Sequence, residues 1–580
     1  MLVAVLAAGL LAWFAWPFLG HGLRFPVGPD APVYLWWARI AGEEGLATVA
    51  SRPGAPAITL VLQGALARTV VESVAALEIA LGAAVGLAAS ALLRGRERAV
   101  WLLGGALAGT FAVHLAAGYV ANLLQVVALL AAAAFLSAGT GSASVVAAAA
   151  LAAGVLAHPS FAALGSGILL LAAAFAWRGD RRDAVREGLA VIGGSVLGAA
   201  ALLTMPTDPA SPRGDTSRDA FLRRAGLQDT LRGSFRDRFF GRWTRYVQWL
   251  SVPLAAIGLG ERDGFVVRFL RAWAIATAAG IGLALATGRL PADRLVTFGF
   301  VVPILSALGL VRLGRRLGRR RALAASAVGA ATVAMLAGSM IAWDRQEPFL
   351  SVEEVSAAGA ANAAAARLDH GTPLAFLVNT TDGTGGFLAA RAANVLRAAM
   401  PPDRIRDVLV VVPPLGAAAD DERTALERIT ADDLRQAERR SGRPATMFVL
   451  RPFNKVDDPE GAIVIEGSTS VSDDSVEPLH ASSPRAIVLS GAVALLVFAA
   501  AGFGWARAVL RDGATAAAAA PAAGAAALVL GAVGLERLDL LLADPAGAWV
   551  VLTIAGGGGY VMWGVLELKA RSHSSAKVDQ

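Results

Sequence analysis

The residues best suited to chemistry are a carboxylate and two arginines, each placed beside an apolar stretch. Asp30 lies in the proline- and glycine-rich segment 26–32 (PVGPDAP), soon after the first apolar run. Such residues on both sides of Asp30 favour a turn. A carboxylate held there can accept the proton of a hydroxyl group and so activate it for attack on a sugar carbon. Asp is also a preferred N-cap, and a helix is expected over 34–40. The two roles are compatible, and both remain open here.

Arg52 and Arg294 form the second candidate group. Each lies where an apolar stretch begins, which is where the chain would re-enter a membrane. The planar guanidinium fork binds a phosphate through two hydrogen bonds, so the pair is suited to holding the phosphate of a lipid-borne donor. The alternative for each is an interfacial arginine that extends to the lipid headgroups.

Further polar residues fall on the same expected side of the membrane. Ionisable groups at membrane depth are costly, so a gathered set indicates a site, here a possible substrate pocket. For His158, which precedes a proline, a helix-end role is the alternative. The pocket candidates are Tyr34, Arg39, His114, Tyr119, Asn122, His158 and Asp293.

Two loops also have compositions that bind anions. The segment 206–245 interleaves many arginines with aspartates and fits either a pyrophosphate or anionic glycan site or an amphipathic surface helix. The segment 379–386 (NTTDGTGG) could cradle an anion on free backbone N–H groups, or it could be a capped tight turn.

The composition predicts how these residues are positioned. The chain has 580 residues, of which 56% are hydrophobic and 17% charged, with a mean hydropathy of +0.57. Several stretches approach the roughly 20 apolar residues that span a bilayer. This excludes an ordinary soluble protein and predicts a polytopic α-helical membrane protein. There is no cysteine, so neither disulfides nor thiolate metal sites are expected.

The apolar runs predict about 14 spans. A transmembrane domain is expected over 1–343, with interfacial helices in 21–68 and the loop 206–245 outside the cytoplasm. Arginine clusters at 94–98, 178–182 and 312–321 indicate cytoplasmic ends, and these place Asp30 on the outer side. Three C-terminal spans over 485–566 and a cytoplasmic tail over 567–580 complete the chain.

Residues 345–484 form one sizeable polar insert. Strands are expected at 373–378, 407–412, 446–450 and 462–465, with helices at 352–368, 385–400 and 422–440 between or before them. Strands that alternate with helices indicate a small α/β domain with a mostly parallel sheet. The span pattern places this domain outside the cytoplasm.

The N-terminal part resembles the GT-C superfamily of membrane glycosyltransferases, especially the protein-mannosyltransferase and aminoarabinose-transferase branch. Three features carry the resemblance: Asp30 followed by Tyr34 and Ala38-Arg39, the segment Arg52-Pro53-Gly54 before a short apolar helix at 55–67, and a late span that opens with Arg294 and contains Pro303. The likeness covers the outline of 1–343, with motifs totalling about thirty residues. Ala31 stands where many relatives have a second acid, and Leu295 replaces a common tyrosine.

The resemblance implies an inverting transferase that moves a sugar from a polyprenyl-phosphate donor to an extracytoplasmic envelope glycan, lipid or protein. Asp30 would be the base, and Arg52 and Arg294 would bind the donor phosphate. No cofactor is certain, although some relatives use a divalent cation. We expect a bacterial plasma membrane protein that contacts lipids and no nucleic acid. The alternative is a non-catalytic scaffold whose 345–484 domain binds an envelope partner.

Overall fold

The computed structural model describes most of the chain in several stretches. They are 2–28, 30–49, 52–93, 95, 97–98, 101, 118–177, 179–205, 251–260, 264–287, 299–316, short pieces between 322 and 337, 350–378, 385–414, 421–454, 460–468 and 479–578. The statements below concern these residues.

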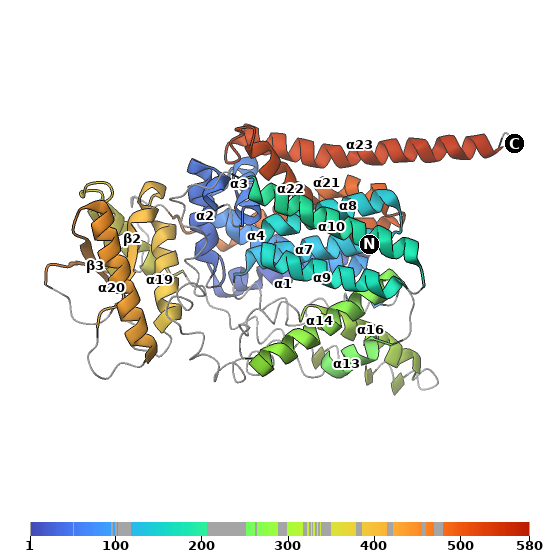
Figure 1. Cartoon of the computed structure of the whole chain (residues 1–580), viewed down its shortest axis with the longest axis horizontal. Helices are drawn as coiled ribbons and strands as arrows, with labels where there is room; N and C mark the ends of the chain where they lie inside the picture. Colours follow the sequence, from blue (N-terminus) through green and yellow to red (C-terminus); the bar gives the residue numbers. More distant parts are fainter. Residues whose placement is uncertain are drawn as a thin grey trace.

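Helices dominate the described part (Figure 1). The N-terminal helices are α1 Leu2–His21, α2 Ala31–Glu44, η1 Leu46–Val49, α3 Gly54–Leu66, α4 Val70–Ala91, α7 Val120–Leu136, α8 Gly141–Ala157, α9 Pro159–Ala176 and α10 Arg181–Leu203. The later helices of the bundle are α13 Ser251–Gly258, α14 Phe265–Thr287, α16 Val301–Arg316, α21 Pro484–Val509, α22 Gly513–Glu536 and α23 Pro545–Val578.

Eight of the described helices are long and apolar enough to cross a membrane. They are Leu2–His21, Val70–Ala91, Pro159–Ala176, Arg181–Leu203, Phe265–Leu283, Pro484–Val509, Gly513–Glu536 and Pro545–Lys569. Three shorter apolar helices, α3, α7 and α8, accompany them. The chain is therefore a helical protein with several candidate membrane spans. Two of the apolar runs counted among the predicted spans, 99–117 and 322–343, lie largely outside the described residues.

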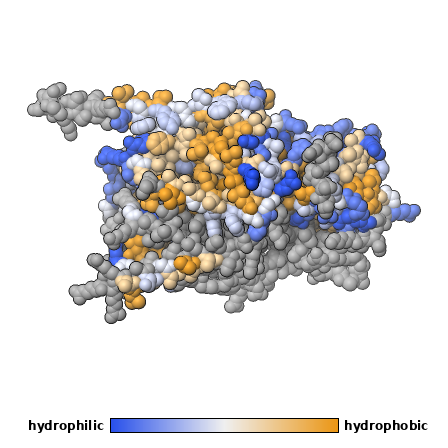
Figure 2. Space-filling view, turned by 180° about the vertical axis from the view of Figure 1, so that it is seen from behind, coloured by the Kyte–Doolittle hydropathy of each residue, from blue (hydrophilic) through white to orange (hydrophobic). Residues whose placement is uncertain are grey.

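The surface of the bundle is apolar where a soluble protein would be polar. Figure 2 shows hydrophobic residues gathered over the middle of one face. Large apolar side chains are exposed on several candidate spans, including Leu203 at 83% on α10, Leu496 at 67% on α21 and Val561 at 68% on α23. Exposed apolar area of this extent is typical of a surface that contacts membrane or another protein.

Helix ends that are distant in sequence meet at two ends of the bundle. At one end, the N–H of Ser482 before α21 donates to the carbonyl of Arg24 after α1, at 3.1 Å. At the other, the guanidinium of Arg98 donates to the hydroxyl of Thr515 in the first turn of α22, at 2.9 Å. The hydroxyl of Thr69, the N-cap of α4, lies 3.4 Å from that of Ser482, and Arg98 donates to the carbonyl of Ser90 in the last turn of α4, so the two meeting points lie at opposite ends of α4.

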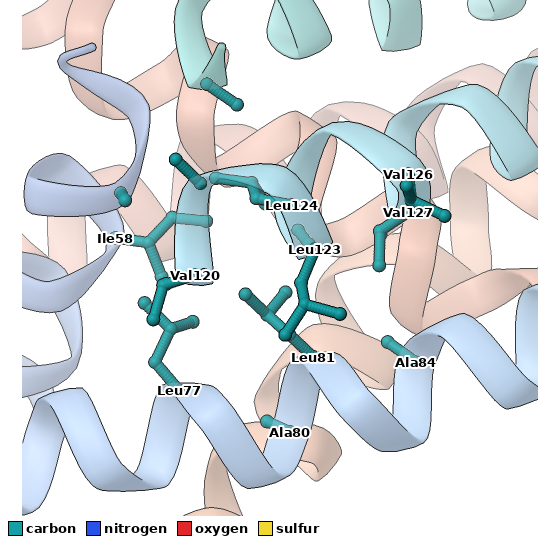
Figure 3. Close-up of a cluster of buried hydrophobic side chains, with 14 of the residues drawn as sticks. Ile58, Leu77, Ala80, Leu81, Ala84, Val120, Leu123, Leu124, Val126 and Val127 are labelled. Atoms are coloured by element: carbon teal, nitrogen blue, oxygen red, sulfur yellow. The ribbon is translucent and has the colours of Figure 1, made fainter. Parts of the chain in front are cut away.

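The core beneath the first end is built from α3, α4 and α7. Figure 3 shows Leu77 and Leu81 of α4 facing Val120 and Leu123 of α7, with Ile58 of α3 beside them. These five side chains are fully or almost fully buried. The packing fixes the N-terminus of α7 relative to the middle of α4, and this matters for the site described below.

The helices α2 and α3, in the segment 21–68 that we predicted to hold interfacial helices, are largely buried within the protein. Of the 13 residues of α3, ten are buried, and α2 buries nine of its 14. The cause is tertiary packing: α22 and α23 cover α3, and α19, over Gly385–Ala399, packs on α2.

Residues 350–468 contain a parallel sheet, called the sheet region below. Its strands are β1 Leu374–Leu377, β2 Val408–Val411, β3 Thr446–Leu450 and β4 Ile463–Ile465, in the order β2-β1-β3-β4. Each strand lies within one residue of its predicted range. The accompanying helices are α18 Val352–Ala365, α19 Gly385–Ala399, η4 Pro402–Asp407 and α20 Asp421–Ser441.

The sheet region rests directly on α2 (Figure 1). The indole N–H of the buried Trp36 donates to the side-chain oxygen of Asn394 at 3.3 Å. The guanidinium of Arg39 donates to the backbone carbonyls of Ala398 and Met400, where α19 ends. A cation at these carbonyls also complements the negative end of the helix dipole. Helix α2 therefore connects the sheet region to the bundle.

Two arginines bridge this contact in different ways, and this gives a first prediction. Arg39 holds partly buried carbonyls, whereas Arg406 pairs with Glu44 at 2.7 Å with both side chains about one-third exposed. Hydrogen bonds to charged groups contribute about 1.5–3 kcal/mol each, but exposed ion pairs contribute only about 0–1 kcal/mol. We expect Arg39→Ala to accelerate amide exchange in the last turn of α19 at least about tenfold, and Arg406→Ala to change it less than about threefold. Equal effects of the two substitutions would contradict the assigned role of Arg39.

Candidate active site

Asp30 occupies the N-cap position of α2 without acting as a cap. The preceding turn is closed by the N–H of Ala31, which donates to the carbonyl of Gly28 at 3.2 Å, with Gly28 at φ +94°. The Asp30 side chain makes no capping hydrogen bond and is partly exposed. The capping alternative is therefore not realised, and the turn presents the carboxylate at the N-terminus of the helix.

Tyr34 lies one turn further along α2 and is 3% exposed. Its phenolic oxygen accepts a hydrogen bond from the N–H of Ala121, in the first turn of α7, at 3.1 Å. Burial raises the pKa of Tyr34, the charge of Asp30 raises it further, and the guanidinium of Arg52 opposes both. The phenol therefore stays protonated, and both charged groups lie close enough to act on it.

The turn before α7 closes against Asp30. Gly118 has φ +68°, and a Cβ atom there would lie 2.7 Å from the nitrogen of Ala31 and 2.9 Å from the carbonyl of Val27. The next residue, Tyr119, is partly exposed, and Asn122 is buried in the first turn of α7. These two predicted pocket residues are thus brought to the turn that carries Asp30.

The close approach at Gly118 gives a second prediction, with Gly22 as its control. Both glycines have positive φ, but a Cβ at Gly22 would meet nothing within 4 Å. Alanine at either position suffers backbone strain of about 1–2 kcal/mol. Gly118→Ala additionally overlaps with backbone atoms, at a further cost of about 1–3 kcal/mol. We expect the thermal midpoint in detergent to fall more for Gly118→Ala than for Gly22→Ala, and similar midpoints would refute the close packing of this turn.

Arg52 reaches the same end of the bundle from the start of α3. Gly54 lies so close to α8 that a Cβ atom would be 3.0 Å from the backbone of Ala157, the residue before His158. Within the part of the chain that the structure describes, the partly exposed guanidinium of Arg52 makes no hydrogen bond or ion pair. It remains a candidate for binding an external anion.

His158 acts as a helix-end residue. Its ring nitrogen Nδ1 accepts from the N–H of Phe161 at 3.5 Å and caps α9, while its ring meets that of Phe161 edge-on at 4.5 Å. The side chain is 3% exposed. His158 therefore has the helix-end role that was the alternative to a place in the substrate pocket.

The guanidinium of Arg39 donates to backbone carbonyls at the end of α19. Arg39 therefore contributes to the contact between α2 and the sheet region and not to the residues around Asp30. His114, Asp293 and Arg294 lie outside the described residues, as do the loop 206–245 and most of the turn 379–386.

Glu78, on α4, also contacts the segment that carries Asp30. The sequence predicts this helix only as a membrane span. The carboxylate of Glu78 is 2% exposed in the middle of α4, and its Oε2 accepts from the N–H of Val27 at 3.0 Å. Glu78 is the only charged residue over 73–93, and an acid within such an apolar run is the sequence signal that identifies this kind of residue.

The arrangement brings together a carboxylate that can accept a proton, a neutral phenol and an arginine that can bind an anion. No group of three or more acidic, histidine or cysteine residues suited to a metal occurs among the described residues. Comparison with protein-family models and with curated proteins returned no match to this chain.

Proposed function

We propose that the protein is an integral-membrane glycosyltransferase that transfers a sugar from a polyprenyl-phosphate donor to an extracytoplasmic acceptor. The observation that carries the proposal is the placement of Asp30. Its carboxylate lies at a helix N-terminus without a capping role, and both this carboxylate and the guanidinium of Arg52 act electrostatically on Tyr34.

In this proposal, Asp30 accepts the proton of an acceptor hydroxyl as its oxygen attacks the anomeric carbon. The bond between that carbon and the donor phosphate breaks, and the electron pair leaves with the polyprenyl phosphate. Arg52 neutralises the negative charge that develops on the phosphate. Arg294, predicted for the same task, would be the second guanidinium.

The proposal includes a membrane arrangement. About 14 spans would place Asp30 at the outer leaflet, and the 345–484 region would be an extracytoplasmic α/β domain. Contact of the sheet region with α2, whose N-cap position Asp30 occupies, supports placing both on the same side of the membrane. The plasma membrane of a bacterium is the expected location.

Mass spectrometry of lipid extracts tests the reaction class. A strain that lacks the protein should accumulate one polyprenyl-phosphate sugar relative to its parent, and the plasmid-borne protein should restore the parental level. Identical lipid-linked sugars in both strains would overturn the proposal. The species that accumulates would also identify the donor.

A further inference from the structure

We propose that Glu78 is a positioning residue that holds the turn carrying Asp30 in its reactive place. This inference rests on the proposed function for its kinetic consequence, but the contact itself can be measured without any substrate.

A carboxylate is costly at the position that Glu78 occupies. Glu78 is 2% exposed in the middle of α4, a candidate span whose most apolar 18-residue stretch is wholly buried. Its second oxygen, Oε1, has no hydrogen-bond partner in the described structure. A buried carboxyl group with an unsatisfied oxygen is destabilising. An apolar side chain would serve the packing better, so packing alone does not explain this residue.

Glu78 binds the backbone of Val27, just before the turn that carries Asp30. Val27 belongs to the irregular segment between α1 and α2, whose backbone donors have no helical partners. Glu78 Oε2 accepts the N–H of Val27, three residues before Asp30, at 3.0 Å. On the other side, the Val27 carbonyl faces the turn before α7, close to Gly118. The backbone of Val27 is therefore bound on one side by α4 and packed on the other side against the turn before α7.

A short stretch of backbone links Val27 to the carboxylate of Asp30. Gly28, at φ +94°, accepts the hydrogen bond that closes the turn before α2, and Asp30 follows within that turn. Fixing Val27 thus fixes the start of the turn, and α2 fixes its end. Without the acceptor on α4, the Val27 N–H would be a buried donor without a partner, and the turn would shift to satisfy it.

Two substitutions distinguish positioning from direct acid–base chemistry. Glu78→Gln keeps an oxygen that can accept from Val27 but cannot ionise. Glu78→Met has a similar length and no comparable acceptor. Glu187→Gln is the matched control, because Glu187 is also 2% exposed in a candidate span but pairs with Arg268 at 2.8 Å.

The first readout is amide exchange in the purified protein, followed by mass spectrometry with fragmentation. Pro26 and Pro29 have no N–H, so a fragment over 26–30 reports only Val27, Gly28 and Asp30. We expect Val27 to be protected in the wild type, in Glu78→Gln and in the Glu187→Gln control. In Glu78→Met it should exchange at least tenfold faster. An unprotected Val27 in the wild type would overturn the proposal even if no variant can be purified.

The second readout is the rate with the donor lipid that accumulates in the deletion strain. We expect Glu78→Met to lower kcat about 10- to 100-fold, with less than a threefold change in the donor KM and an unchanged pH profile. Glu78→Gln should restore kcat to within about threefold of wild type. A Glu78→Gln enzyme as slow as Glu78→Met, with Val27 still protected, would refute positioning and indicate a chemical role. Val27 could exchange as expected while neither the wild type nor any variant consumes the donor lipid. The proposed function would then be wrong, and the contact between Glu78 and Val27 would still be established.

Discussion

Asp30→Asn should abolish sugar transfer while leaving the protein folded. Asparagine keeps the size and turn preference of the residue, and the Asp30 side chain makes no capping bond that would be lost. It cannot accept the proton of an attacking hydroxyl, and loss of a general base costs about 10²- to 10⁴-fold in rate. We therefore expect the variant to fail to complement a deletion strain, in which the donor lipid stays elevated.

Asp539→Asn is the matched control for this substitution. Asp539 is exposed in the turn after α22, with φ +59°, a conformation that asparagine also adopts. Like Asp30→Asn, the variant Asp539→Asn replaces one carboxylate with an amide, and it should complement the deletion strain fully. Full complementation by Asp30→Asn, at equal protein level, would exclude Asp30 as the base.

Arg52→Ala should produce the second largest loss, and in a different parameter. The guanidinium has no partner in the described structure and acts on Tyr34 from nearby. If it binds the donor phosphate in both the ground state and the transition state, its removal should weaken donor binding and slow bond cleavage together. Loss of one such charge-stabilising group typically costs about 10²- to 10³-fold in rate.

The expected signature of Arg52→Ala is a raised donor KM together with a lowered kcat. Arg52→Lys should recover only part of the loss, because a lysine cannot form the bidentate contact. The exposed Arg24, in the segment before Asp30, serves as the control, and Arg24→Ala should behave as wild type. Unchanged kinetics in Arg52→Ala would show that the donor phosphate is held elsewhere.

Much of the site could be predicted from local sequence. The turn at Asp30 follows from the prolines and glycine around it, and Arg52 is marked by its place before an apolar helix. The strands of the sheet region follow from short apolar runs between turn residues. These features depend on a few neighbouring residues, so the sequence pattern reports them directly.

Other features depend on partners that are distant in the chain. Arg39 was predicted for the substrate pocket, but its role is decided by the end of α19, about 360 residues later. The same packing buries nine of the 14 residues of α2, an enclosure that its local sequence did not predict. His158 lies at a helix boundary, where capping its own helix competes with any chemical role.

Turnover by the purified protein tests the central claim most directly. Wild-type protein in detergent or nanodiscs is mixed with the polyprenyl-phosphate sugar extracted from the deletion strain and with envelope material as acceptor. We expect release of free polyprenyl phosphate by the wild type and by Asp539→Asn. We expect at least a hundredfold less release by Asp30→Asn. Equal release by Asp30→Asn and wild type would contradict the account.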